Sequence, residues 1–268
     1  EFDDWWRTET ARRLAPTEIR LTADVAAQVA IARDDRGVPH ILADNDDDLF
    51  FGYGYAMAGD RLFQLDYLRR KGAGRLAEVL GADAVELDLV ARTMGFRYIA
   101  AAEWEQLPQE TRQVLTRFAA GVNAYIESVG EALPIEFSLL DYQPEPWTEI
   151  DCLTVEVEFR WYLTGRIPVI AIPEVVKRSL DSPALYTEFL LGEADDESIL
   201  FPGEYVSVAG KSEPVGAALG SPYEAHGSNN WVLSGERTVS GRPLVASDPH
   251  IAFEAVSCWY EAHLCGGS

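Results

Sequence analysis

The spacing of apolar residues changes near residue 228, and this change limits the possible folds more than any other feature of the sequence. In long segments before it, apolar side chains recur every three or four residues, as on one face of an α-helix. In one such segment they are Phe51, Tyr55, Ala58, Leu62, Leu65 and Leu68. After residue 228, apolar and polar residues alternate as they do in β-strands. Helices followed by strands predict an α+β fold.

Two helices have clear boundary signals. Asn45 precedes three aspartates, an arrangement in which the side chain caps a helix and the acids face the positive end of its dipole. This helix is predicted to end near Lys71 and Gly72. A second helix is expected over residues 108–130, because Pro108 suits a first turn and apolar residues follow on one stripe.

The middle of the chain carries weaker signals. The sequence TEID at 148–151 resembles a capping box and predicts the start of a third helix. Pro168 and Pro173 predict that residues 165–175 are bent or irregular, because proline removes a helical hydrogen bond. Residues 195–220 are rich in Gly, Ser, Pro and acids and are interpreted as a connector.

Strand-like runs lie on both sides of the helices. Residues 28–45 hold two short runs joined around Asp35-Arg36-Gly37, which predicts a hairpin. His40 in the second run is expected to make a structural hydrogen bond rather than to act as a ligand or base. The three runs after residue 228, the first two joined around Ser240-Gly241, are predicted to form one antiparallel sheet. Its unpaired apolar edge is expected to be continued by the natural polypeptide or by a partner chain.

Charge excludes some classes of partner. The 268 residues include 22 Lys and Arg against 44 Asp and Glu, a formal net charge of −22. Such acidity repels phosphate backbones and anionic lipid, so neither nucleic acid nor a membrane surface is expected as a partner. No uninterrupted apolar run is long enough to span a bilayer, and the 47% apolar content is sufficient for a substantial core.

The three cysteines cannot all pair with one another. Cys152, Cys258 and Cys265 also lack the close spacing of a zinc or redox motif, so free and mostly buried thiols are expected. Cys258 and Cys265 are an odd number of residues apart and are predicted to lie on opposite faces of one strand.

The sequence HGSNNWVLSG at 226–235 places a small Gly-Ser peptide directly before a predicted strand. A serine hydroxyl is a poor nucleophile without a base, and the G-x-S-x-G elbow that presents a conventional catalytic serine is absent. If the bond before Ser228 is cut, the freed α-amine, with a reference pKa of about 7.7 to 8.0, can accept the hydroxyl proton. Gly227 suits such a cut because it has no Cβ and allows close approach to its carbonyl.

Two separate stretches resemble one known family. Residues 227–251 (GSNNWVLSGERTVSGRPLVASDPHI) resemble the subunit junction and β-subunit start of the penicillin acylase family, which belongs to the N-terminal nucleophile hydrolases. Residues 34–81, with GVPHI, GYAMAGDRLFQLD and GRLAE, are similar to the opening of that family's α-subunit. The resemblance implies a four-layer αββα sandwich that is incomplete here. It comprises an α-subunit-like segment at 1–194, a connector at 195–227 and a truncated β-subunit start at 228–268.

The resemblance also implies roles for residues at the junction. Ser228 matches the N-terminal nucleophile, its amine matches the base, and the Gly227–Ser228 bond matches the site of self-cleavage. Asn229 matches a position close to the active-site backbone, although a strand-edge side chain that satisfies the backbone explains it equally well. His250 matches a histidine that hydrogen-bonds near the serine amine; without the resemblance it would be interpreted as a turn residue.

Four further residues are assigned more weakly. Ile251 corresponds to an aromatic position of the acyl pocket in relatives that prefer benzylpenicillin, which slightly favours an aliphatic acyl chain. Glu174 corresponds to an α-subunit ligand of the family's structural Ca²⁺, and a solvated glutamate at a helix start is the competing interpretation. His226 is either a proton donor to the departing amine or a solvated loop residue, and His263 is expected to have no chemical role.

The implied function is that of an acylase made as a precursor. It removes an acyl side chain from a β-lactam, an acyl-homoserine lactone or a lipopeptide core, without a redox or organic cofactor. Its implied partners are a small acyl-amide substrate and the remainder of its own β-subunit, and its implied location is the periplasm or the exterior of the cell. Two alternatives stay open: an inactive truncated precursor segment that acts only in folding or assembly with the missing β-subunit remainder, and a conventional Ser-His-Asp esterase.

Overall fold

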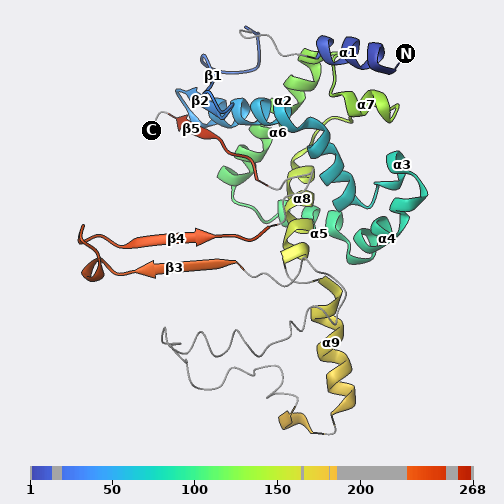
Figure 1. Ribbon diagram of the computed structural model, residues 1–268, viewed down its shortest axis with the longest axis vertical. Coiled ribbons are helices and arrows are strands. Elements are labelled where there is room, and N and C mark those ends of the chain that lie inside the picture. Colours follow the sequence, from blue (N-terminus) through green and yellow to red (C-terminus); the bar gives the residue numbers. More distant parts are fainter. Residues whose placement is uncertain are drawn as a thin grey trace. The chain divides into compact units, whose positions relative to one another are not determined.

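The computed structural model describes residues 2–13, 20–163, 166–180, 182–185, 228–251 and 259–266. The chain divides into two compact units: Glu1–Ala171 with Tyr260–Ser268, called here the helical unit, and Ile172–Trp259, called the hairpin unit. Figure 1 labels the elements of both. The predicted connector lies outside the described residues, so the predicted boundaries around it stay predictions.

Most of the described chain is helical. In the described part, no helix is long and apolar enough to cross a membrane. A short 3₁₀ turn, η1 (Ala82–Ala84), precedes α4. The helices are α1 (Phe2–Arg12), α2 (Asp46–Ala73), α3 (Ala77–Leu80), α4 (Val85–Met94), α5 (Phe96–Trp104), α6 (Gln109–Val129), α7 (Ile135–Leu139), α8 (Glu149–Leu163) and α9 (Arg166–Ser179).

The long helix α2 begins as its capping residues predict. Asn45 is extended, with φ −149°, and its side-chain oxygen accepts a hydrogen bond from Asp48 N at 2.9 Å. The buried carboxylate of Asp48 accepts hydrogen bonds from the amides of Ala26 and Ala27, both at 2.9 Å, and so ties the preceding segment to the helix. The helix ends before Gly74, whose φ of 67° is left-handed, slightly beyond the predicted end.

Glycines allow α2 and α6 to approach closely. A Cβ on Gly54 of α2 would lie 2.1 Å from the carbonyl oxygen of Phe118, and a Cβ on Gly121 of α6 would lie 2.0 Å from that of Phe51. Each glycine therefore faces the backbone of the other helix. The main apolar cluster lies along this contact and contains Ala58, Leu62, Leu65, Ala119, Val122, Leu133, Phe137 and Trp147.

The predicted capping box starts α8. Asp151 N donates to Thr148 Oγ1 at 3.3 Å, and Thr148 N donates to Asp151 Oδ2 at 2.9 Å. α8 packs against α5 and α2. A second apolar cluster, formed by α4, α5 and α8, contains Ala91, Phe96, Ala100, Leu153 and Val157. The three helices expected from boundary signals are confirmed, whereas α3, α4, α5 and α7 were not predicted.

Helix α9 contradicts the expectation drawn from its prolines. It runs from Arg166 to Ser179 and contains Pro173 in its interior. Pro168 falls in the first turn, where backbone N–H groups have no partner within the helix, so it removes no helical hydrogen bond. Pro173 removes one interior bond, and the helix continues past it. The expected irregular stretch is therefore wrong.

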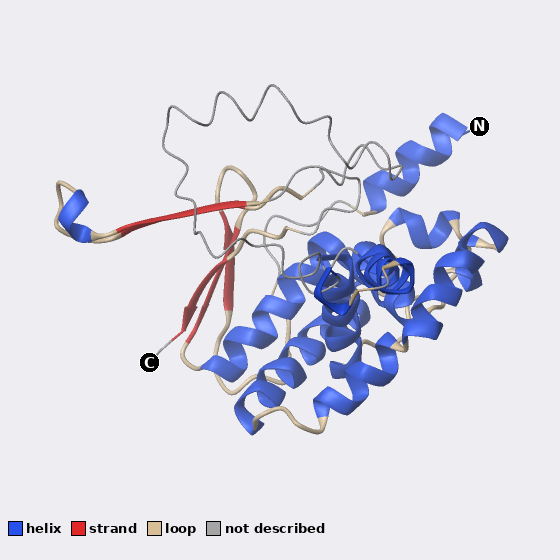
Figure 2. Ribbon diagram, turned by 90° about the horizontal axis from the view of Figure 1, so that it is seen from below, coloured by secondary structure: helices blue, strands red, loops and turns tan. Residues whose placement is uncertain are grey.

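A three-stranded sheet in the order β1-β2-β5 accompanies the helices of the helical unit (Figure 2). β1 (Ala30–Arg33) and β2 (Pro39–Ala43) pair antiparallel, and Gly37 in their turn has φ 81°, so the predicted hairpin is confirmed. Ile41 of β2 is fully buried, in a cluster with Leu49 and Ala56 of α2. These contacts attach the sheet to the helices.

The last strand does not join the sheet that the sequence predicts. β5 (His263–Gly266) pairs parallel with β2, with His263 opposite His40. The expected three-stranded antiparallel sheet is therefore wrong in its third strand. The edge of β2 that faces away from β1 is free, and β5 satisfies the backbone groups there. Residues 252–258, which include Cys258, lie outside the described residues.

The two described cysteines differ in exposure. Cys152 is free; its sulfur accepts a hydrogen bond from Trp147 Nε1 at 3.1 Å, and burial raises its pKa to about 12. Cys265 is also free but exposed on β5, so the expectation of buried thiols is wrong for this residue.

The hairpin unit contains the other sheet. β3 (Asn229–Leu233) and β4 (Leu244–Asp248) pair antiparallel, from Asn229 opposite Asp248 to Leu233 opposite Leu244, which confirms the predicted pairing. Gly241 in the connection has φ 66°. Every residue of the two strands is exposed, including the apolar ones.

Candidate functional site

The β3–β4 pairing brings the two predicted catalytic residues together. Asn229 is paired with Asp248, and Ser228 and His250 lie just beyond this pair at the open end of the hairpin. The two residues are 22 positions apart in the chain, and the antiparallel register of β3 and β4 brings them together.

Two contacts define the geometry of the site. The backbone N–H of His250 donates to Ser228 Oγ at 3.2 Å. The ring of His250 is held separately, because its Nε2 lies 2.8 Å from Asp248 Oδ2. The side chains of His250 and Asp248 are 35% and 68% exposed, so the site is open to solvent.

This geometry leaves the serine proton available to a base. Because the His250 amide donates to Oγ, the hydroxyl hydrogen must point elsewhere. The described contact between His250 and the hydroxyl runs through the backbone, while the ring contacts Asp248. In a conventional triad the ring itself takes the serine proton. The arrangement therefore suits a serine whose base is another group, such as its own α-amine.

Asp248 is a site residue that the sequence analysis missed. Its carboxylate contacts the His250 ring, and its backbone lies opposite Asn229. The signal was present in the sequence SDPH, because residues two apart in an extended segment point to the same side. The carboxylate of an aspartate can therefore orient the ring of a histidine two residues later.

The remaining predicted residues of the junction have less defined surroundings. Asn229 opens β3 and is exposed, and Ile251 follows His250 and is partly buried. Gly227 and His226 lie outside the described residues. The roles assigned to these four residues stay predictions.

Glu174 offers little to a calcium ion. Its carboxylate accepts a hydrogen bond from Arg178 Nε at 3.1 Å, one turn later in α9. Ca²⁺ takes six to eight oxygen ligands. Among the described residues there is no group of three or more His, Cys, Asp or Glu arranged to hold a metal ion. Glu174 thus supplies one carboxylate that is already paired, and the calcium site stays a prediction.

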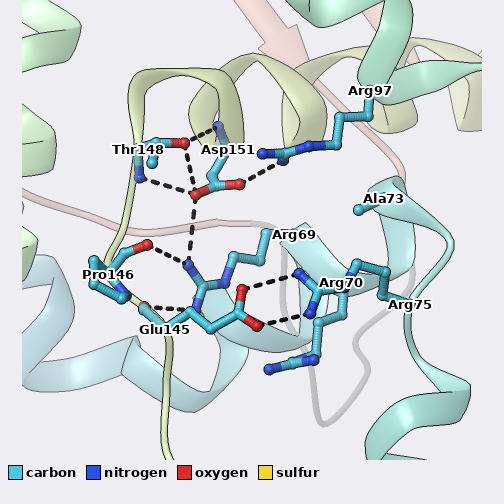
Figure 3. A pocket seen from close by; sticks show the side chains of 9 residues that line it. All are labelled: Arg69, Arg70, Ala73, Arg75, Arg97, Glu145, Pro146, Thr148 and Asp151. Atoms are coloured by element: carbon cyan, nitrogen blue, oxygen red, sulfur yellow. Dashed lines mark hydrogen bonds and ion pairs between the residues drawn. The ribbon is translucent and has the colours of Figure 1, made fainter.

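A second candidate site is a cavity of about 80 Å³ in the helical unit (Figure 3). Four arginines line it, an arrangement typical of anion sites. Here, however, each guanidinium group already contacts a carboxylate of the same unit. The pairs are Arg69–Asp66, Arg70–Asp66, Arg70–Glu78, Arg75–Glu78, Arg75–Glu145 and Arg97–Asp151.

The centre of this arginine cluster is fully buried. Asp66 is 1% exposed and accepts hydrogen bonds at 2.8 Å from Arg69 Nε, Arg70 Nε and Tyr142 Oη. Burial, together with the charge of Asp66, raises the pKa of Tyr142. Arg69 also donates to the carbonyl oxygens of Glu145 and Pro146. The cluster therefore joins α2 to the loop before α8, and its charges are matched without a ligand.

Comparison with known proteins gives one consistent result. A family model described as penicillin amidase matches residues 28–268. Penicillin acylase 2 proenzyme from Pseudomonas sp. strain SE83 is 34% identical over 258 residues, covering 90% of this chain and 32% of that protein. Acyl-homoserine lactone acylase QuiP from Pseudomonas aeruginosa is 29% identical over 271 residues, covering 95% of this chain and 31% of that protein. The chain thus spans about a third of the length of these relatives.

A solved structure is also similar. Thermostable penicillin G acylase from Alcaligenes faecalis matches with a TM-score of 0.52 and 32% identity, over 65% of this chain and 96% of that chain. This similarity confirms the predicted fold class. The chain has an incomplete α+β fold of the penicillin acylase type, with many helices and few strands.

Proposed function

Because the chain belongs to the penicillin amidase family, we propose that the complete polypeptide is an amide hydrolase whose nucleophile is Ser228. The observation that carries the proposal is the hydrogen bond from the His250 amide to Ser228 Oγ at 3.2 Å. It fixes the oxygen while leaving its proton free for transfer. A serine presented in this way needs a base close to its own backbone, and its own α-amine fits that requirement.

The proposed precursor is cut between Gly227 and Ser228. Ser228 Oγ attacks the carbonyl carbon of Gly227, the C–N bond breaks, and the departing amine takes up the hydroxyl proton. Water then hydrolyses the resulting ester, which yields a carboxylate on Gly227 and a free amine and hydroxyl on Ser228. Two findings support this step. One relative is named a proenzyme. The curated relatives are much longer than the present chain, whereas the matched solved chain is shorter than it.

Turnover repeats the same chemistry on a substrate. The α-amine, with a reference pKa of about 7.7 to 8.0, accepts the hydroxyl proton as Oγ attacks the substrate's acyl carbon. The proton passes to the departing amine, and an acyl ester remains on Ser228. Water hydrolyses that ester and releases the acid.

His250 and Asp248 act as positioning residues in this scheme. The His250 amide fixes the serine oxygen, and the Asp248 carboxylate, 2.8 Å from Nε2, fixes the ring. An oriented ring next to the new terminus is suited to hydrogen-bonding the amine. The conventional Ser-His-Asp esterase is less well supported, because the described contact between His250 and Ser228 Oγ runs through the backbone N–H rather than the ring, and the strained elbow is absent.

The proposed substrates are amides that join an acyl side chain to a small amine. The names of the relatives point to a β-lactam or a homoserine lactone as the amine, and a lipopeptide core belongs to the same chemical class. Ile251, at a position that corresponds to an aromatic residue in relatives that prefer benzylpenicillin, slightly favours an aliphatic acyl chain over an aromatic one. Initial rates on amides from phenylacetyl to long aliphatic acyl groups, each on a lactam and a lactone amine, would identify the substrate.

The proposed partner of the β3–β4 hairpin is the remainder of the same polypeptide. Trp231, Val232 and Val245 are 68%, 70% and 74% exposed, and an isolated two-stranded hairpin is at best marginally stable in water. Further strands laid against this hairpin would bury these side chains. Structural calcium and a periplasmic or extracellular location are part of the same proposal and rest on the family alone.

Intact-mass measurement of the full-length protein tests the function. Wild type is expected to give two chains that separate before Ser228, and Ser228→Ala to give one uncut chain without amidase activity. Ser240→Ala, which alters a serine in the β3–β4 connection, should be cut like wild type. Cleavage of the Ser228→Ala protein, or an uncut wild-type chain with full activity, would overturn the proposal.

A further inference from the structure

His40 and His263 meet in the helical unit, and the proposed hydrolysis uses neither of them. They are paired residues on the parallel strands β2 and β5, 223 positions apart in the chain. Their Nδ1 atoms are 3.0 Å apart, and the rings meet edge to face at 73° with centroids 5.1 Å apart. Each ring therefore presents Nδ1 to the other.

We propose that His40 and His263 form a binding site for a divalent transition-metal ion, with Zn²⁺ or Cu²⁺ as the preferred occupant. Imidazole nitrogen suits these ions. Zinc binds such nitrogens at about 2.0–2.1 Å, so two ligands at a tetrahedral angle are about 3.3 Å apart. The separation of 3.0 Å between the Nδ1 atoms is close to this value, and the two rings turn about their side-chain bonds to direct both lone pairs at the ion. Both residues are solvent-accessible, which lets water complete the coordination.

Metal binding requires only a change of tautomer in this pair. In the hydrogen bond, one Nδ1 carries the proton and the other accepts it, whereas a metal needs a lone pair on both. The proton that leaves Nδ1 moves to Nε2 of the same ring, so both imidazoles stay neutral. His40 is suited to this change, because its Nε2 lies 3.8 Å from Asp34 Oδ2. A carboxylate facing the outer N–H of a ligating histidine is the usual companion of such sites.

Asp34 is held rigidly in the turn between β1 and β2. Its Oδ1 accepts hydrogen bonds from the amides of Arg36 at 3.0 Å and Val38 at 2.9 Å. The Arg36 guanidinium, 3.5 Å from Asp34 and 3.9 Å from Glu261, provides the balancing cation on the outer side.

The proposed site is open to solvent and uses only two protein ligands. It is therefore compatible with the finding that the described residues contain no group of three or more His, Cys, Asp or Glu that could hold a metal ion. The formal net charge of −22 favours cations near the surface. Because the two ligands lie on neighbouring strands, a bound ion would fasten β5 to β2. That attachment links the segment after the β3–β4 hairpin to the first hairpin of the chain.

Calorimetric titration of the metal-free full-length protein with Zn²⁺, in excess Ca²⁺ to saturate oxygen sites, tests the proposal. Wild type is expected to bind one ion at this site, and His40→Gln and His263→Gln to bind it at least tenfold more weakly. Asp34→Asn should weaken binding by about tenfold, as loss of an outer partner does at other sites. His250→Gln and Cys265→Ser, which remove other exposed ligands, should bind like wild type. Equal affinity of wild type and His263→Gln would overturn the proposal.

Crystals of the wild-type protein soaked in Zn²⁺ give a test that does not depend on the folding of variants. An anomalous-scattering peak is expected between the two Nδ1 atoms, at about 2.0–2.1 Å from each. Zinc bound elsewhere, with the two rings still hydrogen-bonded to each other, would contradict the assignment.

Discussion

The helical unit and the β3–β4 hairpin place charge and apolar surface in opposite ways. In the helical unit, Asp66, Arg69 and Arg70 are almost fully buried, and the Asp66 carboxylate contacts both guanidinium groups. In the hairpin, every strand residue is exposed and the proposed nucleophile stands at the open end. The unit with the most specific packing carries none of the proposed hydrolytic chemistry, and the element with that chemistry has no core of its own. Substitutions in the first should therefore change stability, and substitutions in the second should change processing and turnover.

The largest expected effect tests the buried charges of the helical unit. Asp66→Ala leaves two buried guanidinium groups without their shared carboxylate and should lower the free energy of unfolding by about 3–5 kcal/mol. Urea unfolding of the full-length protein measures the change. Glu103→Gln removes the partly exposed partner of Arg160 and should cost less than about 1 kcal/mol. Equal costs for the two variants would break the contrast between buried and exposed charge.

The next effect tests the close contact between α2 and α6. Gly54→Ala places a methyl group against the Phe118 carbonyl and should destabilise by about 1–3 kcal/mol. Gly59 provides a matched control in the same helix, because its Cβ would lie 3.5 Å from the nearest atom, on the Tyr125 ring. Gly59→Ala should be neutral or stabilising, since alanine favours helix. Thermal unfolding of both variants decides whether the approach of the helices or helix propensity dominates.

A smaller effect is expected in the hairpin, and in turnover rather than stability. Asp248→Asn removes the charged partner of the His250 ring and should lower kcat by about tenfold, a typical value for a lost charge-assisted hydrogen bond. KM and the unfolding midpoint should stay near wild type, and the pH profile of kcat should shift. Glu236→Gln, an exposed carboxylate between the same strands, should leave all of these unchanged. An unaltered kcat in Asp248→Asn would remove the pair from the site.

The smallest effect concerns acid stability of the helical unit. Hydrogen bonds from Arg75 lower the pKa of Glu145 from 4.5 to about 2. A carboxylate whose folded pKa is depressed contributes stability above its unfolded pKa and loses that contribution as the pH falls from about 4.5 to about 2. Because Glu145 is half exposed, the contribution should be below about 1 kcal/mol. Glu145→Gln should flatten the stability–pH curve in this window, and an identical curve would refute the assignment.

Local signals predicted the helices that carry caps. Asn45 and the Thr148–Asp151 pair make the hydrogen bonds that their sequences indicate, and the predicted hairpin turns at Gly37, which is left-handed. The short helices α3, α4 and α5 between α2 and α6 have no side-chain cap at their start. The place of β5 beside β2 depends on which strand edge is free after folding, and no local pattern encodes that.

The site was predictable in part. Ser228 and His250 were found through the resemblance to a family, and the register of β3 and β4 explains how they meet. Asp248 was missed because its importance depends on the direction of the His250 ring, which follows from the fold. The carboxylates that neutralise the four arginines were also not predicted, since Asp66 and Asp151 come from different helices.

Trapping the acyl ester tests directly whether Ser228, as a free N-terminal residue, is the nucleophile. The full-length protein would be mixed with an active acyl amide, quenched in acid and mapped by peptide mass spectrometry. An acyl group is expected on the Ser228 side chain, in a peptide whose first residue is Ser228 with a free amine. An acyl group on any other residue, or on Ser228 within an uncut Gly227–Ser228 chain, would contradict this assignment.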